Sequence, residues 1–167
     1  YRAAREGLAK LGHKTTIDYL IAMAELVLSE TGLLPHSNPG VVTRDQAAAL
    51  RQITVSQGIM LETASERLCQ RGKPHFGSPD KLPAVRLEAI AEAGELAIPF
   101  TSGILIGIGE TRDERLDTLF ALRDLHARHG HIQEIIVQNF RAKPNTSMFG
   151  LAEPNIEEMI RTVSYTH

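Results

Sequence analysis

The stretch Pro99-Phe-Thr-Ser-Gly-Ile-Leu-Ile-Gly-Ile-Gly-Glu-Thr-Arg-Asp-Glu114 decides the fold. Its first half is a nearly continuous apolar run, which is typical of a parallel strand covered on both faces. Gly107 and Gly109 then allow a tight turn and a close approach by another group. Thr111 and Glu114 have capping-box spacing, and apolar residues follow at helical spacing. We predict one βα unit: a strand, a glycine turn and a helix.

Composition indicates a globular protein, and its charge balance makes small-molecule chemistry the better expectation. The 167 residues are 43% hydrophobic and 23% charged, with a formal net charge of -2. This balance gives no electrostatic footprint for nucleic acid or for an acidic membrane surface. Cys69 is the single cysteine, so no intrachain disulfide and no cysteine-only metal site can form, and a cytoplasmic location is expected. No apolar run is long enough to span a bilayer, and Tyr1 suggests that the sequence begins within a longer protein.

The remaining elements alternate between helix and strand. Capping residues and helical spacing predict helices over 15–31, 43–53, 65–69, around 87–94, and after Asn155. Apolar or alternating runs predict strands over 33–36, 55–62 and 132–140, and a polar loop covers 71–83. Strict alternation predicts a parallel α/β sheet with right-handed crossovers. About four strands are present, too few to close a barrel.

Ligands of such folds bind where the parallel strands end. The sequence therefore directs attention to residues 36–38, 57–62, 107–110 and 138–141. At the strand end near 138–141, Gln138 and Asn139 could bind a heterocycle or satisfy the loop backbone.

The glycine turn and a histidine cluster each have two interpretations. Gly107 and Gly109 could cradle a phosphate, but Arg112 stands where a dinucleotide fingerprint needs its third glycine. A tight turn, or a glycine-lined edge against an adenine or sugar, is the alternative. His126, His129 and His131 resemble metal-ligand spacing, yet histidines in the last turn of a helix also satisfy free carbonyls there.

Glu62 lies within an apolar run, where an unpaired acid is costly. It could pair with Arg86, near the start of the next helix, or remain solvated at the end of the strand. Cys69 could be a nucleophile, but a cysteine in a helix is usually a small apolar filler.

Five stretches, in order, closely resemble the FO synthase family of radical S-adenosylmethionine enzymes, in the deazaflavin-ring-forming subunit or the equivalent half of the fused enzyme. The resemblance covers about residues 5–163 and rests on 30–38, 56–62, 75–81, 98–111 and 130–140.

The resemblance implies a radical lyase reaction. Such enzymes form the 8-hydroxy-5-deazaflavin (FO) chromophore of coenzyme F420 from an adduct of tyrosine and 5-amino-6-ribitylaminouracil, which a partner half makes. A reduced 4Fe–4S cluster splits S-adenosylmethionine, the resulting radical abstracts hydrogen from the adduct, and the ring closes with loss of ammonia. The hard chemistry belongs to the cofactors, which the protein positions.

The resemblance also implies site residues. Glu62 and Arg86 match the pair that holds the amino acid part of S-adenosylmethionine. The expected contacts with its adenosine part are Gly103, Leu105, Gly107, Glu110, Val137 and Asn139. Barrel geometry adds His36, Asn38 and Gln57, together with Asn139, as candidate substrate contacts.

Two departures limit the resemblance. The chain has no CxxxCxxC loop, which provides the three thiolates of the cluster, and it lacks the family's second-strand motif. We therefore expect 1–163 to be the central and C-terminal part of a partial (β/α)6 radical S-adenosylmethionine barrel, about its last four strands, with a non-matching tail at 164–167.

Two other functions remain open from the sequence. One is a sister radical enzyme, either the tyrosine-lyase half of the same pathway or a menaquinone-route enzyme. The other is a non-catalytic scaffold that binds adenosine.

Overall fold

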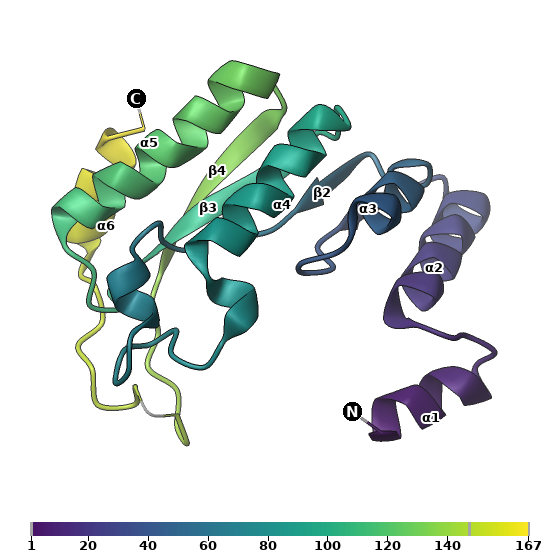
Figure 1. Ribbon diagram of the computed structural model, residues 1–167, viewed down its shortest axis with the longest axis horizontal. Helices are drawn as coiled ribbons and strands as arrows, with labels where there is room; N and C mark the ends of the chain where they lie inside the picture. The colour runs from purple at the N-terminus through teal and green to yellow at the C-terminus, as the bar shows by residue number, and fades with distance from the viewer. Residues whose placement is uncertain (1, 147, 167) are drawn as a thin grey trace.

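The computed structural model describes residues 2–146 and 148–166 as an arc of parallel strands lined by helices (Figure 1). In chain order the elements are α1 (Arg2–Lys10), α2 (Thr16–Thr31), β1 (His36–Ser37), α3 (Arg44–Arg51), β2 (Ser56–Gly58), the 3-10 helices η1 (Glu66–Cys69) and η2 (Pro79–Lys81), α4 (Pro83–Glu95), β3 (Phe100–Ile106), α5 (Arg112–His129), β4 (Ile132–Asn139) and α6 (Ile156–Ser164).

The four strands are parallel and lie in the sheet in their sequence order, β1-β2-β3-β4. Doubly wound folds reverse the order of their strands, whereas a barrel adds each new strand on the same side. The predicted parallel α/β sheet is confirmed, and its order is that of a segment of a (β/α) barrel.

One hydrophobic core fills the space between the sheet and the helices. Its buried members come from α3, α4, α5 and the strand segments, and include Ala47, Ile59, Leu61, Ile90, Ala93, Ile98, Phe100, Ile104, Ile106, Leu119, Leu122, Leu125 and Ile132. Along β3 the even-numbered residues are buried in or beside this core, while Thr101 and Leu105 are half-buried on the opposite face. The helices thus cover one face of the sheet, and the other face is more open.

The predicted βα unit is confirmed. β3 runs directly into α5, whose start carries a complete capping box: the Thr111 side chain accepts from Glu114 N at 3.2 Å, and Thr111 N donates to the Glu114 carboxylate at 2.7 Å. α5 ends at Gly130, whose φ of 66° lies in the left-handed region that glycine adopts readily.

Two predicted strands are wrong in extent. The strand predicted over 33–36 lies at His36–Ser37, because β2 provides hydrogen-bonding partners only from Val55 onward, and Leu33 and Leu34 are exposed. The strand predicted over 55–62 ends at Gly58, and the chain rejoins the sheet only at Glu62, opposite Ile104.

The structure differs from the sequence predictions near both ends of the described residues. The sequence did not predict α1, whose residues are mostly exposed and which lies with α2 at one end of the arc (Figure 1). At the other end Ser164 belongs to α6 and Tyr165 caps it, whereas residue 167 of the predicted tail lies outside the described residues.

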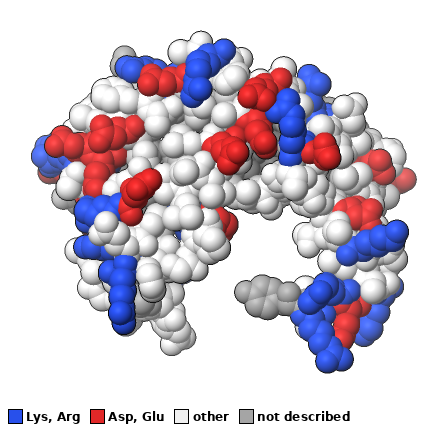
Figure 2. Space-filling view, viewed as in Figure 1, with Lys and Arg blue, Asp and Glu red and all other residues white. Residues whose placement is uncertain are grey.

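Acidic and basic side chains are interspersed over the surface, and the arc encloses a wide hollow (Figure 2). Among the described residues, no helix is both long and apolar enough to cross a membrane.

Candidate functional site

The carboxyl ends of β2 and β3 meet at Glu62. Glu62 is four positions after Gly58, whereas Ile104 is only three positions after Thr101 on the partner strand, so the segment after β2 bulges by one residue. Glu62 then takes a left-handed φ of 63°. Its amide donates to Gly103 O at 3.0 Å, and its carbonyl accepts from Leu105 N at 2.9 Å, which fixes the residue at this edge.

Three basic side chains surround the Glu62 carboxylate. His75 Nε2 lies 2.8 Å from Oε2, Lys81 Nζ lies 2.9 Å from both oxygens, and Arg86 Nη1 lies 3.0 Å from Oε1. His75 and Arg86 are buried, and the Glu62 side chain is 12% exposed. Of the two interpretations of Glu62, the structure shows the paired one. We call Glu62, His75, Lys81 and Arg86 the Glu62 cluster.

The cluster changes the acidity of Glu62. Burial alone would raise the pKa of this carboxyl, but hydrogen bonds from His75 and Lys81 and the charges of Lys81 and Arg86 outweigh burial and lower it from 4.5 to about 2. Glu62 is therefore a carboxylate at neutral pH, held among groups of opposite charge.

Arg86 also fastens the polar loop to the sheet. Its Nε donates to Asp80 O at 2.9 Å, and its Nη1 donates to Met60 O in the bulge. Lys81 is more accessible, with a third of its side chain exposed. Sequence reasoning missed His75 and Lys81 as partners of Glu62. Their signals were a long polar loop with three prolines over 71–83 and the family-like stretch 75–81, which they begin and end.

In the glycine turn after β3, the carboxylate of Glu110 occupies the backbone amides of the turn. The Glu110 carboxylate accepts hydrogen bonds from Gly107 N and Ile108 N, each at 2.8 Å, and from Arg115 Nε at 2.7 Å. The tight-turn interpretation of Gly107 and Gly109 therefore holds, because the amides that could cradle a phosphate already have an anion. Gly107 has φ 90°, and a Cβ there would lie 2.3 Å from Pro154.

An arginine ties the turn to the segment that follows Glu62. Arg67 of η1 donates to Gly109 O at 2.8 Å. It also forms a bidentate ion pair with Glu114, from Nε to Oε1 at 2.9 Å and from Nη2 to Oε2 at 2.7 Å. Ser65 Oγ donates to the same carboxylate at 2.5 Å. The Glu62 cluster and the glycine turn thus share one rim, at the ends of neighbouring strand segments.

The strand register separates the predicted adenosine contacts into two groups. Strand neighbours point to the same face, so Gly103 and Leu105 share the open face with Ile136 and Gln138. Val137 and Asn139 pair with Ile104 and Ile106 on the helix-covered face, and Val137 packs against the core. The roles of all these residues stay predictions, which the register favours for Gly103 and Leu105 and disfavours for Val137.

The other three predicted substrate residues, besides Asn139, lie in different environments. Gln57 is buried, and its Nε2 donates to Ala47 O of α3 at 2.9 Å, so its side chain points into the helix layer. His36 Nδ1 lies 2.7 Å from Ser56 Oγ, and Asn38 is exposed in the loop after β1. This geometry is compatible with ligand contacts for His36 and Asn38 and disfavours one for Gln57.

The predicted histidine group and Cys69 contact other parts of the protein. His131 Nε2 lies 2.9 Å from Ile90 O, and His129 packs edge-to-face on His131. Over residues 2–146 and 148–166, no group of three His, Cys, Asp or Glu side chains is placed to hold a metal ion. Burial raises the pKa of the Cys69 thiol, whose Sγ lies 3.8 Å from Lys81 O.

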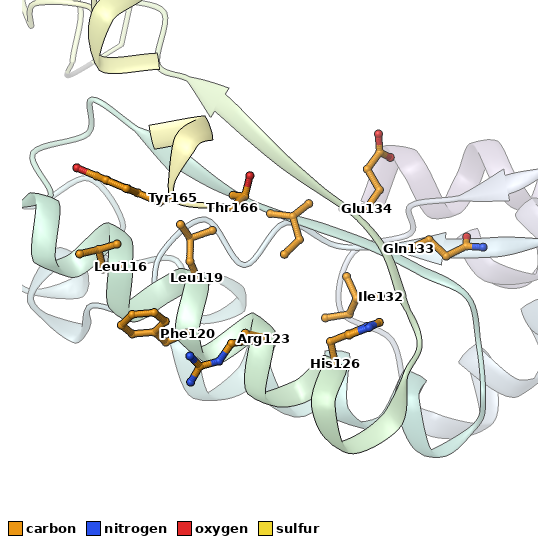
Figure 3. Close-up of a pocket in the computed structure, with 11 residues that line it drawn as sticks. Leu116, Leu119, Phe120, Arg123, His126, Ile132, Gln133, Glu134, Tyr165 and Thr166 are labelled. Atoms are coloured by element: carbon orange, nitrogen blue, oxygen red, sulfur yellow. The ribbon is translucent and has the colours of Figure 1, made fainter. Parts of the chain in front are cut away.

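A separate pocket of about 300 Å³ lies between α5, β4 and the end of α6 (Figure 3). Leu116, Phe120, Ile132 and Tyr165 are among its apolar lining. It belongs to the helix layer rather than to the strand ends, and it contains no member of the Glu62 cluster.

The chain is similar to known proteins over nearly its whole length. No family model matches the chain. The FO synthase of Mycobacterium tuberculosis is 52% identical over 165 residues, which cover 98% of this chain and 19% of that protein. The 7,8-didemethyl-8-hydroxy-5-deazariboflavin synthase of Methanopyrus kandleri is 47% identical over 164 residues, which cover 98% of this chain and 49% of that protein. The chain thus spans about a fifth to a half of these relatives.

Solved structures share the fold. The [FeFe]-hydrogenase maturase HydG superimposes with a TM-score of 0.76 at 18% identity, over 90% of this chain and 35% of that one. Methylornithine synthase (PylB) gives a TM-score of 0.69 at 18% identity, over 91% and 44%. The chain therefore shares the fold of part of these two structures. Over nearly its whole length it is homologous to part of the proteins named FO synthase.

Proposed function

We propose that this chain, homologous over 98% of its length to part of the FO synthases, is the section of a deazaflavin-forming radical S-adenosylmethionine lyase that binds the cofactor's amino acid and adenosine parts. The whole enzyme would form FO from the tyrosine/5-amino-6-ribitylaminouracil adduct, with a partner half supplying that adduct. The Glu62 cluster is the observation that carries the proposal.

The cluster suits an amino acid group. An α-ammonium needs an anion, which Glu62 supplies in ionised form, and an α-carboxylate needs cations, which Lys81 and Arg86 supply. Arg86 is fixed by Met60 O and Asp80 O, whereas Lys81 is accessible enough to turn towards an incoming carboxylate. His75 contacts Oε2 of Glu62, whereas Arg86 contacts Oε1, and His75 thereby helps to orient the carboxylate.

Leu105 and Gly109 give the adenosine part a neighbouring surface. Leu105 is half-buried on the open face, and space remains open where a Cβ at Gly109 would lie. Bound S-adenosylmethionine supplies the hydrogen-abstracting group of the reaction. The side chains of this chain bind and orient it at the strand ends.

The residues described here do not fit a 4Fe–4S cluster. Such clusters need several thiolates, and this sequence has only Cys69, whose thiol is turned towards a backbone carbonyl in the loop. We therefore assign the 4Fe–4S cluster to a part of the enzyme outside this chain.

Calorimetry of the full-length protein that contains this chain tests the proposal. We expect S-adenosylmethionine to bind, and Glu62→Gln to weaken its affinity by roughly tenfold or more, because loss of one charged hydrogen bond costs about 1.5–3 kcal/mol. Glu157→Gln, on the exposed face of α6, is the matched control.

A product assay with the adduct-forming half completes the test. Formation of the deazaflavin supports the proposal. Binding of S-adenosylmethionine with no deazaflavin product would contradict it and would favour a sister enzyme or a scaffold.

A further inference from the structure

We propose that the Glu110 carboxylate occupies the anion site formed by the backbone amides of Gly107 and Ile108 in the glycine turn, and so prevents phosphate from binding there. The site therefore selects ligands that carry no phosphate at this edge. The selectivity rests on the proposed function, since it concerns the adenosine edge of that site. The occupation of the two amides by Glu110 does not depend on the proposed function.

The turn has the geometry of an anion site. Gly107 N and Ile108 N are consecutive amides that converge on one carboxylate at 2.8 Å each, and Arg115 Nε adds a charged donor at 2.7 Å. Converging consecutive amides after a parallel strand are the arrangement that commonly holds phosphates in α/β proteins. Here a side chain three residues further along the chain takes that position.

The internal anion is difficult to displace. The Glu110 side chain is 3% exposed, and Arg115 is held in turn by Glu158 at 2.8 Å and by Thr162 at 3.2 Å. Pro154 packs against Gly107 on the other side of the turn. A phosphate would have to break three hydrogen bonds, and its charge would repel the carboxylate within a site of low water access.

Removing the carboxylate should expose the site. Glu110→Ala would leave two unpaired amides and a buried guanidinium, and a buried cation without its partner is strongly unfavourable. A free anion that entered the space would restore all three interactions. The variant is therefore expected to gain affinity for phosphate that the wild-type chain lacks.

The test is a titration of the 15N-labelled 167-residue chain with inorganic phosphate, followed at the amides of Gly107 and Ile108. We expect no saturable shift in the wild-type chain and saturable shifts in Glu110→Ala, with an affinity at least about tenfold higher than in the wild type. Glu157→Ala removes an equal charge from an exposed position and is expected to behave as the wild type.

Stability provides a second readout if Glu110→Ala is poorly folded. Phosphate that binds the native state alone raises its melting temperature, so the variant should gain more from added phosphate than Glu157→Ala does. Saturable binding at these amides in the wild type, or equal phosphate responses in the two variants, would overturn the inference. Because no S-adenosylmethionine is present, failure of the proposed function would leave this result unaffected.

Discussion

Backbone strain and the candidate site coincide at Glu62. A non-glycine residue at φ 63° costs on the order of 1 kcal/mol or more, and such residues persist where their surroundings hold them. Two backbone hydrogen bonds to β3 and three basic side chains supply that constraint. The carboxylate is thereby aimed at the rim, away from the direction that a regular strand would give it.

The pH dependence of stability should report this residue. The native pKa of Glu62 is about 2, below its ordinary 4.5, so its contribution is complete above pH 4.5 and disappears as the pH falls towards 2. The difference corresponds to roughly 3 kcal/mol at neutral pH. Urea unfolding of wild-type protein and Glu62→Gln should differ by about this amount at pH 7 and converge in acid.

The matched control for that experiment is Glu157→Gln, which removes a carboxylate from an exposed position of α6. It is expected to change the free energy of unfolding by less than about 0.5 kcal/mol at any pH. A Glu62→Gln effect that stays constant between pH 7 and pH 2 would show that the carboxylate charge is not what stabilises the native state.

Half of the Glu62 cluster could be predicted from the sequence. An acid in an apolar run demands a cation, and Arg86 near the start of the next helix was within reach. His75 and Lys81 could not be found in this way, because the loop that carries them has no hydrophobic period to fix where its side chains point. Their positions depend on turns and on hydrogen bonds such as Arg86 Nε to Asp80 O.

At the scale of elements, α4 and α5 pack closely at one glycine. A Cβ built on Gly94 would lie 2.6 Å from Cγ and 2.7 Å from Cβ of His129, which are too near the α5 backbone to swing aside. We expect Gly94→Ala to destabilise the protein by about 1–3 kcal/mol through overpacking, despite the higher helix propensity of alanine. Thermal or urea unfolding measures the change.

A double-mutant cycle isolates that contact. His129→Gly alone removes both opposing atoms, Cβ and Cγ, and the Gly94→Ala, His129→Gly double variant should be more stable than the sum of the two single losses predicts. Additive losses in the double variant would mean that the cost of Gly94→Ala does not arise from the helix interface.

A register shift explains why the sequence did not show which residues of β4 lie on which face of the sheet. β3 and the start of α5 follow local signals, namely an apolar run and a capping box, and they were predicted correctly. In β4 the register shifts near its first residues, where Phe100 pairs with Ile132 but Thr101 pairs with Glu134. An extra residue reverses the faces of all that follow, so alternation alone could not place Val137 and Asn139.

Over the whole molecule, the sheet has one covered face and one open face. The four strands follow in sequence order, and α3, α4 and α5 share a single core with them. The Glu62 cluster and the glycine turn lie along the edge where β2 and β3 end. A rim of this kind offers positions for a ligand but, in this chain, a single thiol. If the proposed function is correct, ligand positioning and 4Fe–4S binding therefore belong to different parts of the whole protein.

Iron–sulfur reconstitution tests that division. The 167-residue chain, incubated anaerobically with iron and sulfide, should retain no stoichiometric iron and no cluster absorbance, because Cys69 alone cannot supply the several thiolates that a 4Fe–4S cluster requires. Cys69→Ser should give the same background as the wild type, whereas the full-length protein with a CxxxCxxC loop should bind the cluster. A stoichiometric cluster in the 167-residue chain, lost in Cys69→Ser, would contradict the division and place iron in the loop beside Lys81.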